Sequence, residues 1–309
     1  EALRGCRIPR GSAANLPIES SNTEQSGNEA VVALLDDQPV KAASFIVTVY
    51  GDAVEPRGGV VWIGNLIEVC GEIGISETLV RTAASRLVAT GQLVGEKSGK
   101  RSFYRLTPSA QIEFASAAKQ LFSPDRENKW RFIYLSGTGI DDEIRQFERH
   151  GYARVAPSLL VGCRPLPPST IANVTVFDAI VDGGEAHLRE FASEYSDLGP
   201  LAIAYRKFIE RYSGLKSHVV SAKDALSLRL LLVHDFRHIV LRDPNLPREA
   251  LPVEWPGKEA RQLFSLLYRT WSEEADKRIG LSFVSAAGPL RAHTGATRHR
   301  DDLLCEFQY

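Results

Sequence analysis

The stretch from 76 to 106 places the tightest limit on what this chain can fold into. Residues 76–91, SETLVRTAASRLVATG, predict a short amphipathic helix between a serine and a glycine. Ser76 suits the N-cap because its hydroxyl can accept a hydrogen bond from the first turn, where the helix dipole also favours Glu77. One face must be buried. Its residues are Ile75, Leu79, Val80, Ala83, Ala84 and Leu87.

The opposite face of this helix is polar, and a hairpin follows it. The candidate contact residues on this face are Thr78, Arg81, Thr82 and Ser85. Two β-prone runs, 93–96 and 102–106, flank KSGK, so a hairpin with Ser98 and Gly99 at its tip is expected. The hairpin cations are Lys97, Lys100 and Arg101. A winged helix-turn-helix has the same order along the chain: two helices, a third helix with a polar face, and a cationic hairpin. The third helix enters the major groove.

Local charge supports contact between this stretch and double-stranded DNA. Residues 76–105 hold six Lys or Arg against two Glu, whereas the whole chain of 309 residues has a formal net charge of −1. Affinity for a polyanion must therefore come from local clustering and not from the field of the whole protein. The alternative is a solvated helix beside an ordinary exposed hairpin.

The whole chain is predicted to be a multidomain α+β protein with a tail at each end. We interpret 1–33 as a disordered tail because it is polar and lacks apolar periodicity. The winged helix-turn-helix DNA-binding domain is assigned to 34–124. A central ferredoxin-like connector and dimerisation domain, 125–195, follows a β-α-β-β-β-α pattern. Apolar spacing of three and four predicts a helical domain at 196–280, and 281–309 is read as a second tail.

Cysteine usage and hydropathy argue for a cytoplasmic protein. The four cysteines show no CxxC spacing, which argues against a zinc ribbon or a disulfide framework and favours a reducing compartment. No apolar run approaches the ~18 residues of a membrane span, so no membrane partner is expected. Because GxGxxG, P-loop and GxSxG motifs are also absent, no cofactor is predicted.

One segment leaves an enzymatic alternative open. His234 and His238 lie four residues apart in VHDFRHIV with Asp235 between them, which is one residue away from the HExxH motif of zinc proteases. A metal-dependent hydrolase that uses these three residues is therefore the alternative function. Against it, no third ligand is evident, and a polar cluster that joins two helices explains the same residues.

Two N-terminal segments, FIVTVYGDAVEPRGGVVWIGNLI and ETLVRTAASRLVATGQLVGEKSGKRSFYRLT, resemble the PaaX family of phenylacetic acid catabolism repressors, which are GntR-like winged-helix regulators. WRFIYLSG, GYARVAPSLLVG and LLLVHDFRHIVLRDPNLPREALPVEWPG continue this resemblance in the same order, from about Leu34 to Gly280. It implies a cytoplasmic, homodimeric, non-enzymatic repressor of catabolic genes that binds operator DNA. It also implies release by an aryl- or acyl-CoA effector, phenylacetyl-CoA in the namesake.

The resemblance directs attention to the C-terminal helices as the effector sensor. The candidate effector-binding residues are His234, Arg237, His238 and Trp255. The cations would meet the phosphates of coenzyme A, and the tryptophan would cover the acyl part. The alternative is that these cations pair with nearby carboxylates and bind no ligand.

The central domain also resembles the fold of the small CRISPR-associated nucleases, which raises a second enzymatic alternative. Those enzymes carry a metal-binding aspartate at the end of the first strand. Here that strand ends YLSGTG, and Asp141 and Asp142 come later, at a helix start where acids are favoured by the dipole. Nuclease activity is therefore not expected, and dimer contacts are assigned to this domain instead.

Overall fold

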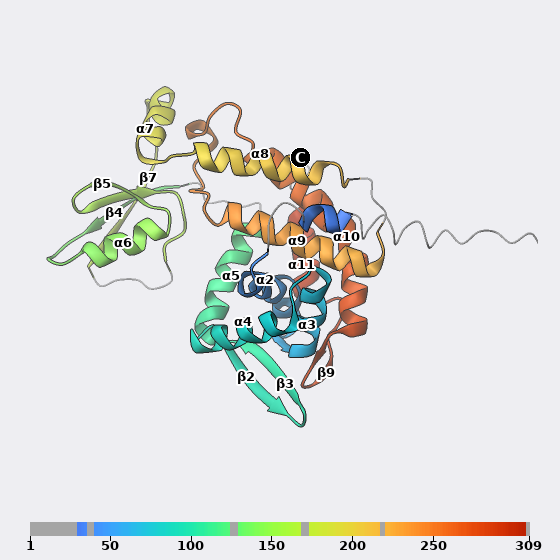
Figure 1. Ribbon diagram of the computed structural model, residues 1–309. Helices are drawn as coiled ribbons and strands as arrows, with labels where there is room; N and C mark the ends of the chain where they lie inside the picture. The colour runs from blue at the N-terminus through green and yellow to red at the C-terminus, as the bar shows by residue number, and fades with distance from the viewer. Residues whose placement is uncertain (1–29, 36–39, 124–128, 168–172, 217–219, 307–309) are drawn as a thin grey trace, which may run out of the picture.

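The computed structural model describes residues 30–35, 40–123, 129–167, 173–216 and 220–306. The protein is α+β: a helical body carries a three-stranded sheet at one end, and a four-stranded sheet stands to one side of it (Figure 1). Within the described ranges no helix is long and apolar enough to cross a membrane.

The N-terminal part combines helices with the three-stranded sheet. Its elements are α2 (Ala42–Val49), a π-helical turn (Tyr50–Val54), a 3-10 turn (Glu55–Arg57), β1 (Val60–Trp62), α3 (Ile63–Glu72), α4 (Glu77–Ala89), β2 (Leu93–Ser98), β3 (Arg101–Leu106) and α5 (Pro108–Phe122). The strand order is β1-β3-β2, with antiparallel pairing throughout. The predicted cap of α4 is confirmed, because the Ser76 hydroxyl accepts a hydrogen bond from the amide of Leu79.

Two details of the predicted helix and hairpin are wrong. The side chain of Leu79 is 56% exposed, whereas the other residues assigned to the buried face of α4 are buried. At about 100° per residue, Leu79 lies roughly a quarter-turn from the middle of that face, which explains its exposure. The hairpin tip is Gly99 and Lys100, one residue later than expected, because Ser98 pairs with Arg101. Gly99 has φ +60°, which a two-residue hairpin loop accommodates.

The central part is an antiparallel sheet with a helix against each face. Its elements are β4 (Trp130–Leu135), α6 (Asp141–Arg149), β5 (Ala153–Ala156), β6 (Leu159–Gly162), β7 (Val174–Ala179), a 3-10 turn (Glu185–His187) and α7 (Leu188–Tyr195). The strands lie in the order β5-β6-β4-β7. Apolar residues of α6 and of α7 contribute to two separate small clusters with the strands. The order of strands and helices along the chain matches the expected β-α-β-β-β-α pattern.

The C-terminal helices share one hydrophobic core with the N-terminal part. They are α8 (Gly199–Ser213), α9 (Ala222–Val240) and α10 (Gly257–Ser282), with a 3-10 turn (Arg248–Ala250) between the last two. Helix α9 lies in the middle of the body, between α10 and α2 (Figure 1), and most of its side chains are buried. One continuous cluster includes Phe45 of α2, Val80 of α4, Phe236 of α9 and Trp271 of α10. A movement of the C-terminal helices therefore acts directly on the packing of the N-terminal part.

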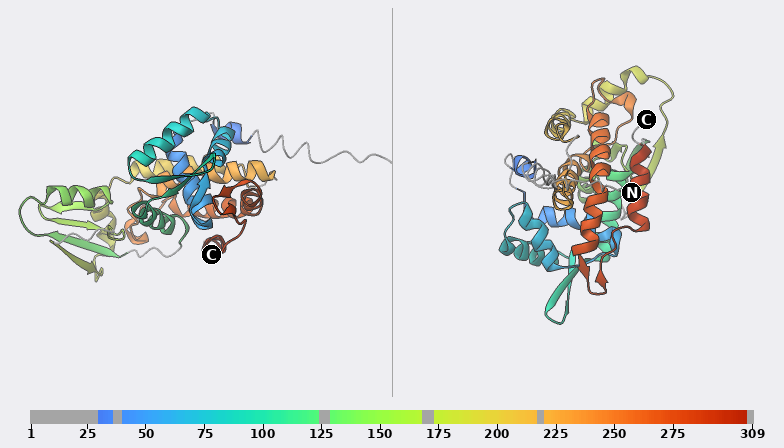
Figure 2. Two further views of the ribbon diagram at one scale, coloured as in Figure 1. Left: turned by 90° about the horizontal axis from the view of Figure 1, so that it is seen from below. Right: turned by 90° about the vertical axis from the view of Figure 1, so that its right-hand side faces the viewer.

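The predicted tails need correction where the structure describes them. The C-terminal region is not loose: β8 (Val284–Ser285) and β9 (Gly288–Pro289) form a hairpin, and α11 (Gly295–Cys305) follows. Phe283, Leu290 and Leu304 of this region are buried, although the sequence there has no regular apolar spacing that would predict it. Figure 2 shows this hairpin at the same end of the molecule as β2–β3. At the N-terminus, 1–29 lies outside the described residues, and 30–35 is helical with Ala30, Val31 and Leu34 buried.

Candidate nucleic-acid interface

Helix α4 is held so that its polar face stays outside. Val80, Ala83, Ala84 and Leu87 are buried and belong to the main core, which fixes the helix against α2 and α3. The predicted contact residues are all exposed: Thr78, Arg81, Thr82 and Ser85. These side chains therefore share one solvent-facing surface, to which the exposed Leu79 adds an apolar group.

Arg81 and Thr82 already have local partners on α4. The Arg81 guanidinium lies 2.8 Å from the Glu77 carboxylate, and both side chains are more than half exposed. An exposed pair at this spacing contributes only about 0.3–0.5 kcal/mol, so a stronger anion can displace Glu77. The Thr82 hydroxyl donates to the Thr78 carbonyl at 2.8 Å, which leaves its methyl group available for apolar contact.

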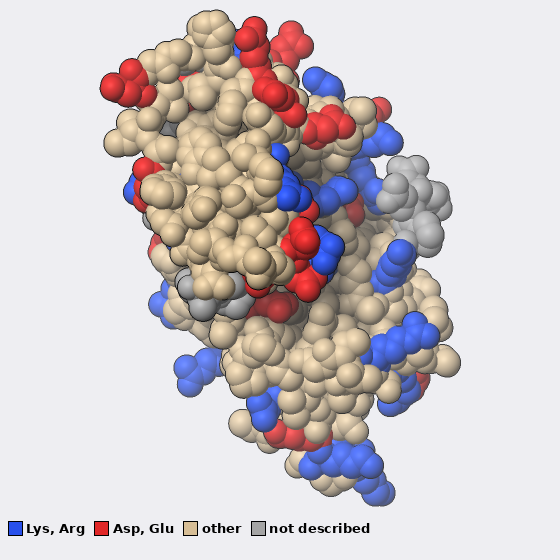
Figure 3. Space-filling model, turned by 90° about the vertical axis from the view of Figure 1, so that its left-hand side faces the viewer, with Lys and Arg blue, Asp and Glu red and all other residues tan. Residues whose placement is uncertain are grey.

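The β2–β3 hairpin carries the second set of predicted residues. Lys97, Lys100 and Arg101 are all exposed at or near its tip, and Lys and Arg side chains gather at this lower end of the molecule in Figure 3. The Arg101 guanidinium lies 4.8 Å from the ring centroid of Trp62 on β1, a cation–π contact that orients it. The hairpin therefore presents three cations at one end of the molecule.

The structure gives the predicted effector residues contacts with the N-terminal part. The His234 Nδ1 lies 3.0 Å from the Thr48 hydroxyl of α2. The His238 Nε2 lies 3.1 Å from the Ser44 hydroxyl, and Arg237 donates to the same hydroxyl at 3.1 Å. These three residues form a polar contact between α9 and α2. The expected link between two C-terminal helices is made by Asp235, which contacts Tyr212 and Arg211 of α8.

Trp255 has a different neighbour from the other effector candidates. Its ring packs edge-on against Tyr205 of α8, with 5.7 Å between ring centroids. Tyr205 in turn donates a hydrogen bond to Asp243 at 2.6 Å. The contacts described for Trp255 do not link it to the three residues on α9.

The proposed zinc-protease geometry is not formed by the histidines of α9. Both ring nitrogens of His238 have hydrogen-bonding partners, since its Nδ1 lies 2.7 Å from the His234 carbonyl and its Nε2 faces Ser44. Asp235, the would-be general base, accepts a hydrogen bond from the Tyr212 hydroxyl at 2.8 Å. Across the described part of the chain, no group of three or more His, Cys, Asp or Glu residues is placed to hold a metal ion.

The central-domain acids are also engaged locally. Asp142 forms an exposed ion pair of 2.6 Å with Arg145, three residues later in the first turns of α6. Arg145 and Arg149 lower the pKa of the Asp142 carboxyl, the hydrogen bond from Arg145 being the largest cause. The position of these acids at the helix start agrees with the role of favourable dipole partners.

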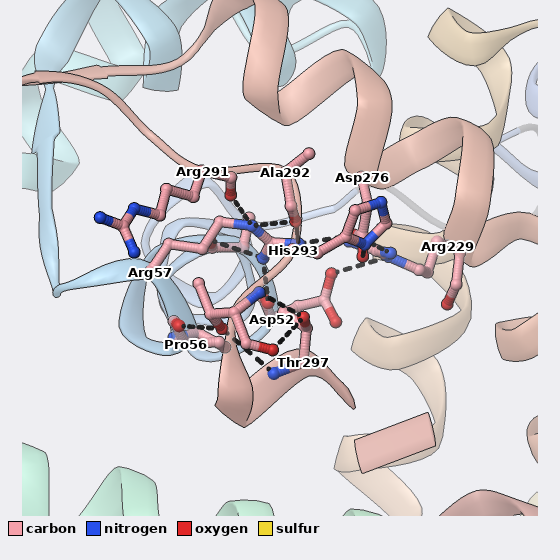
Figure 4. Close-up of polar contacts among 12 residues, drawn as sticks. Asp52, Pro56, Arg57, Arg229, Asp276, Arg291, Ala292, His293 and Thr297 are labelled. Carbon is pink, nitrogen blue, oxygen red and sulfur yellow. Dashed lines mark hydrogen bonds and ion pairs between the residues drawn. The ribbon is translucent and has the colours of Figure 1, made fainter. Parts of the chain in front are cut away.

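A buried ion-pair network, which the sequence analysis did not predict, joins the N-terminal part to α9 and α10 (Figure 4). The Asp276 Oδ1 of α10 accepts from Arg57 at 2.6 Å and from Arg229 of α9 at 2.7 Å. Arg229 also donates to Asp52 at 3.0 Å, and the Tyr268 hydroxyl donates to the same carboxylate at 2.8 Å. The side chains of the two aspartates and two arginines are at most 5% exposed.

The charges of this network balance one another. Burial by itself raises the pKa of Asp52, but Arg229, then Arg300 and the Tyr268 hydrogen bond, outweigh it and lower that pKa. Arg57 additionally donates to the backbone carbonyls of Arg291 and Ala292, which ties the C-terminal segment to the turn after α2. The network therefore fixes α9, α10 and the C-terminal segment to the turns Tyr50–Val54 and Glu55–Arg57, which precede β1 of the three-stranded sheet.

The position of Arg229 in the sequence is a signal for this network. Arg229 is the one charged residue in LSLRLLLV, the most apolar part of α9. A charged side chain in a helix stretch buried on all sides requires a buried partner of opposite charge. The sequence does not identify that partner, because Asp52 and Asp276 lie far from Arg229 along the chain.

Comparison with known proteins places the chain among regulators. Two family models match it: PaaX-like protein over residues 41–110 and PaaX-like protein C-terminal domain over residues 196–279. The transcriptional repressor PaaX of Escherichia coli (strain K12) is 31% identical over 303 aligned residues, which cover 87% of this chain and 95% of that protein. A solved structure, uncharacterized protein Rv0674 from Mycobacterium tuberculosis, is 19% identical with a TM-score of 0.48 and covers 77% of this chain and 98% of that chain.

Proposed function

The chain belongs to the PaaX family, a family of transcriptional regulators rather than enzymes, and from this premise we propose that it represses catabolic genes by binding operator DNA. The N-terminal part acts as a winged helix-turn-helix, with α4 as the recognition helix and β2–β3 as the wing. The four-stranded sheet acts as a ferredoxin-like connector, supported by the order β5-β6-β4-β7 in an antiparallel sheet. The repressor works in the cytoplasm as a homodimer.

The observation that carries this proposal is the exposed polar face of α4 beside the cationic hairpin. Arg81 is held by one weak exposed pair, so it can turn to the edge of a guanine, while the threonine methyls suit thymine. Lys97 and Lys100 at the wing suit backbone phosphates, which position the protein without reading sequence. The core behind α4 keeps the helix rigid while it enters the groove.

We assign release to an aryl- or acyl-CoA effector, phenylacetyl-CoA or a similar thioester. The supporting contact is the one between α9 and α2, because His234, Arg237 and His238 hold Ser44 and Thr48 of the helix on which α4 packs. An anionic effector that recruits Arg237 and His238 competes with Ser44 and loosens α2. Release requires that the effector prefer the state that cannot bind DNA, and a shift from 1:99 to 99:1 needs about 5.5 kcal/mol of differential affinity.

Selection from a random duplex library tests the proposed function. The purified full chain is incubated with the library, and bound DNA is sequenced over successive rounds. Two recognition helices related by a two-fold axis should enrich an inverted repeat with half-sites about 10–10.5 bp apart, or a multiple of that spacing. Retention of the unselected library composition after several rounds would contradict the proposal.

A further inference from the structure

The β8–β9 hairpin, residues 284–289, stands beside the proposed wing, β2–β3. Strand β8 lies against β1, the edge strand of the three-stranded sheet opposite to β2. Both hairpins lie at the same end of the molecule (Figures 1 and 2). The β8–β9 hairpin lies outside both matched family regions, 41–110 and 196–279. DNA that contacts the wing therefore has a second hairpin beside it, formed by a different part of the chain.

The start of the β8–β9 hairpin is fixed to the helix that precedes α4. Asn65 of α3 is 2% exposed, and its amide nitrogen donates to the Ser282 carbonyl at 2.8 Å. Its amide oxygen accepts from the Val284 amide at 3.0 Å. One buried side chain thus pairs with an acceptor and a donor of the backbone that enters β8. Because α3 packs against α4, the hairpin and the proposed recognition helix keep a fixed relative position.

The backbone that leaves the β8–β9 hairpin is fixed as well, and it presents a free cation. Arg57 donates to the carbonyls of Arg291 and Ala292, at 3.0 Å each, and the Thr294 hydroxyl donates to the Pro56 carbonyl at 2.8 Å. These contacts use only the backbone of Arg291, whose side chain is exposed. Its guanidinium points away from the buried network (Figure 4) and has no ion-pair or hydrogen-bond partner among the described residues.

The composition of this segment suits a polyanion. Residues 277–300 contain five Lys or Arg and no Asp or Glu, in a chain whose formal net charge is −1. Local clustering of this kind supplies the attraction that the whole protein lacks.

The hairpin tip is small and preformed. Ala286 and Ala287 form the tip and are exposed, and Ser285 pairs with Gly288 below them. The Ser285 hydroxyl accepts from the Ala287 amide at 3.2 Å and donates to the Gly288 carbonyl at 3.0 Å, which closes the turn. Side chains this small let the main chain come close to a phosphate. Protein interfaces are instead depleted in Ala and Ser and enriched in aromatic residues, so a DNA backbone fits this tip better than a protein partner.

We propose that the β8–β9 hairpin is a second wing, which contacts the phosphate backbone of double-stranded DNA through Arg291 and the main chain of the tip. This inference rests on the proposed function and adds a contact surface beyond α4 and β2–β3. The second wing contributes affinity and position but no base preference, because phosphate contacts carry no sequence information. It extends the protected DNA backbone beyond the stretch that β2–β3 covers.

The salt dependence of binding to DNA selected by the parent chain tests the second wing. Arg291→Ala should make the slope of log K against log salt concentration shallower by about one unit, on selected and unrelated DNA alike. The matched control is Lys207→Ala on α8, an exposed cation on the helix at the opposite end of the molecule (Figure 1), and it should keep the parental slope. In hydroxyl-radical footprints, Arg291→Ala should lose protection at backbone positions that Lys100→Ala keeps.

A pair of substitutions at the tip separates a DNA contact from a purely structural role. Ala286→Lys should tighten binding and steepen the salt slope, whereas Ala286→Glu should weaken binding and make the slope shallower, because the two charges act oppositely on a phosphate. A tip that only supports the fold would respond to both substitutions in the same direction. Circular dichroism of each variant checks folding.

The outcomes separate the second wing from the proposed function. A parent chain that enriches no DNA removes the proposed function and this inference together. A parent that binds selected DNA, with a shallower slope in Lys100→Ala but the parental slope and footprint in Arg291→Ala, overturns the second wing and leaves the proposed function standing. A shallower slope in Arg291→Ala, with opposite effects of the two Ala286 substitutions, supports the second wing.

Discussion

Removal of the Asp276 carboxylate tests whether the buried network holds the N-terminal and C-terminal parts together. Asp276→Ala deletes the common acceptor of Arg57 and Arg229, at 2.6 and 2.7 Å. Each such charge-assisted hydrogen bond contributes about 1.5–3 kcal/mol. After this change the buried Arg57 guanidinium keeps only backbone carbonyls as hydrogen-bond acceptors among the described residues. Breaking a buried pair in this way costs about 3–5 kcal/mol of unfolding free energy.

Urea unfolding, followed by circular dichroism and tryptophan fluorescence, measures this loss. The matched control is Glu274→Ala, two residues earlier in α10, whose exposed pair with Lys277 contributes about 0–1 kcal/mol. Asp276→Asn keeps the side-chain shape and one acceptor oxygen, so its loss of unfolding free energy should fall between those of Asp276→Ala and Glu274→Ala. If Asp276→Ala costs no more than Glu274→Ala, the network does not stabilise the fold and the reasoning fails.

Two further predictions concern pH and the effector. Burial, together with the nearby side chains of His238, Arg237 and Arg211, lowers the pKa of His234 to about 3, well below its usual 6.5. The unfolded chain then binds a proton that the folded chain excludes, so stability is lost as pH falls below about 6.5. Between pH 7 and 5, His234 should therefore lower the free energy of unfolding by about 2 kcal/mol. Urea titrations of His234→Asn should lack this loss. An equal pH dependence in the parent and the variant would refute the prediction. Phenylacetyl-CoA, but not phenylacetate, should displace the full chain from selected DNA in gel shifts, with calorimetry reporting binding; binding without displacement would refute the coupling.

Local signals in the sequence were enough to locate most helices. Pro108 is a proline suited to the first position of a helix, and α5 begins at that residue and ends at Phe122. The capped helix after Ser76 was expected from its serine and its apolar face. Such features act within a few residues of one another, so the sequence carries them directly.

Features that depend on distant contacts could not be read in the same way. The two-residue strands β8 and β9 are too short for a periodic pattern. Leu304 is buried in the main core, and its carbonyl accepts a hydrogen bond from Ser265 of α10, which is distant in the sequence. Leu79 lies to one side of the buried face of α4, but the middle of that face is set by the packing of α2 and α3, which the sequence alone does not place. For the candidate interface, the sequence predicted which residues are exposed, but not the Trp62 contact that orients Arg101.

The most direct test of the central claim is the salt dependence of binding to selected DNA by the parent, Arg81→Ala and Lys100→Ala. Arg81→Ala should lose about 1–3 kcal/mol on the selected site and relax preference at one base position, because a groove-facing arginine reads base edges. Lys100→Ala should weaken selected and unrelated DNA alike and reduce the salt slope by about one unit, as loss of a phosphate contact does. Binding equal to that of the parent in both variants, across the whole salt series, would contradict the assignment of α4 and β2–β3 as the DNA-reading surface.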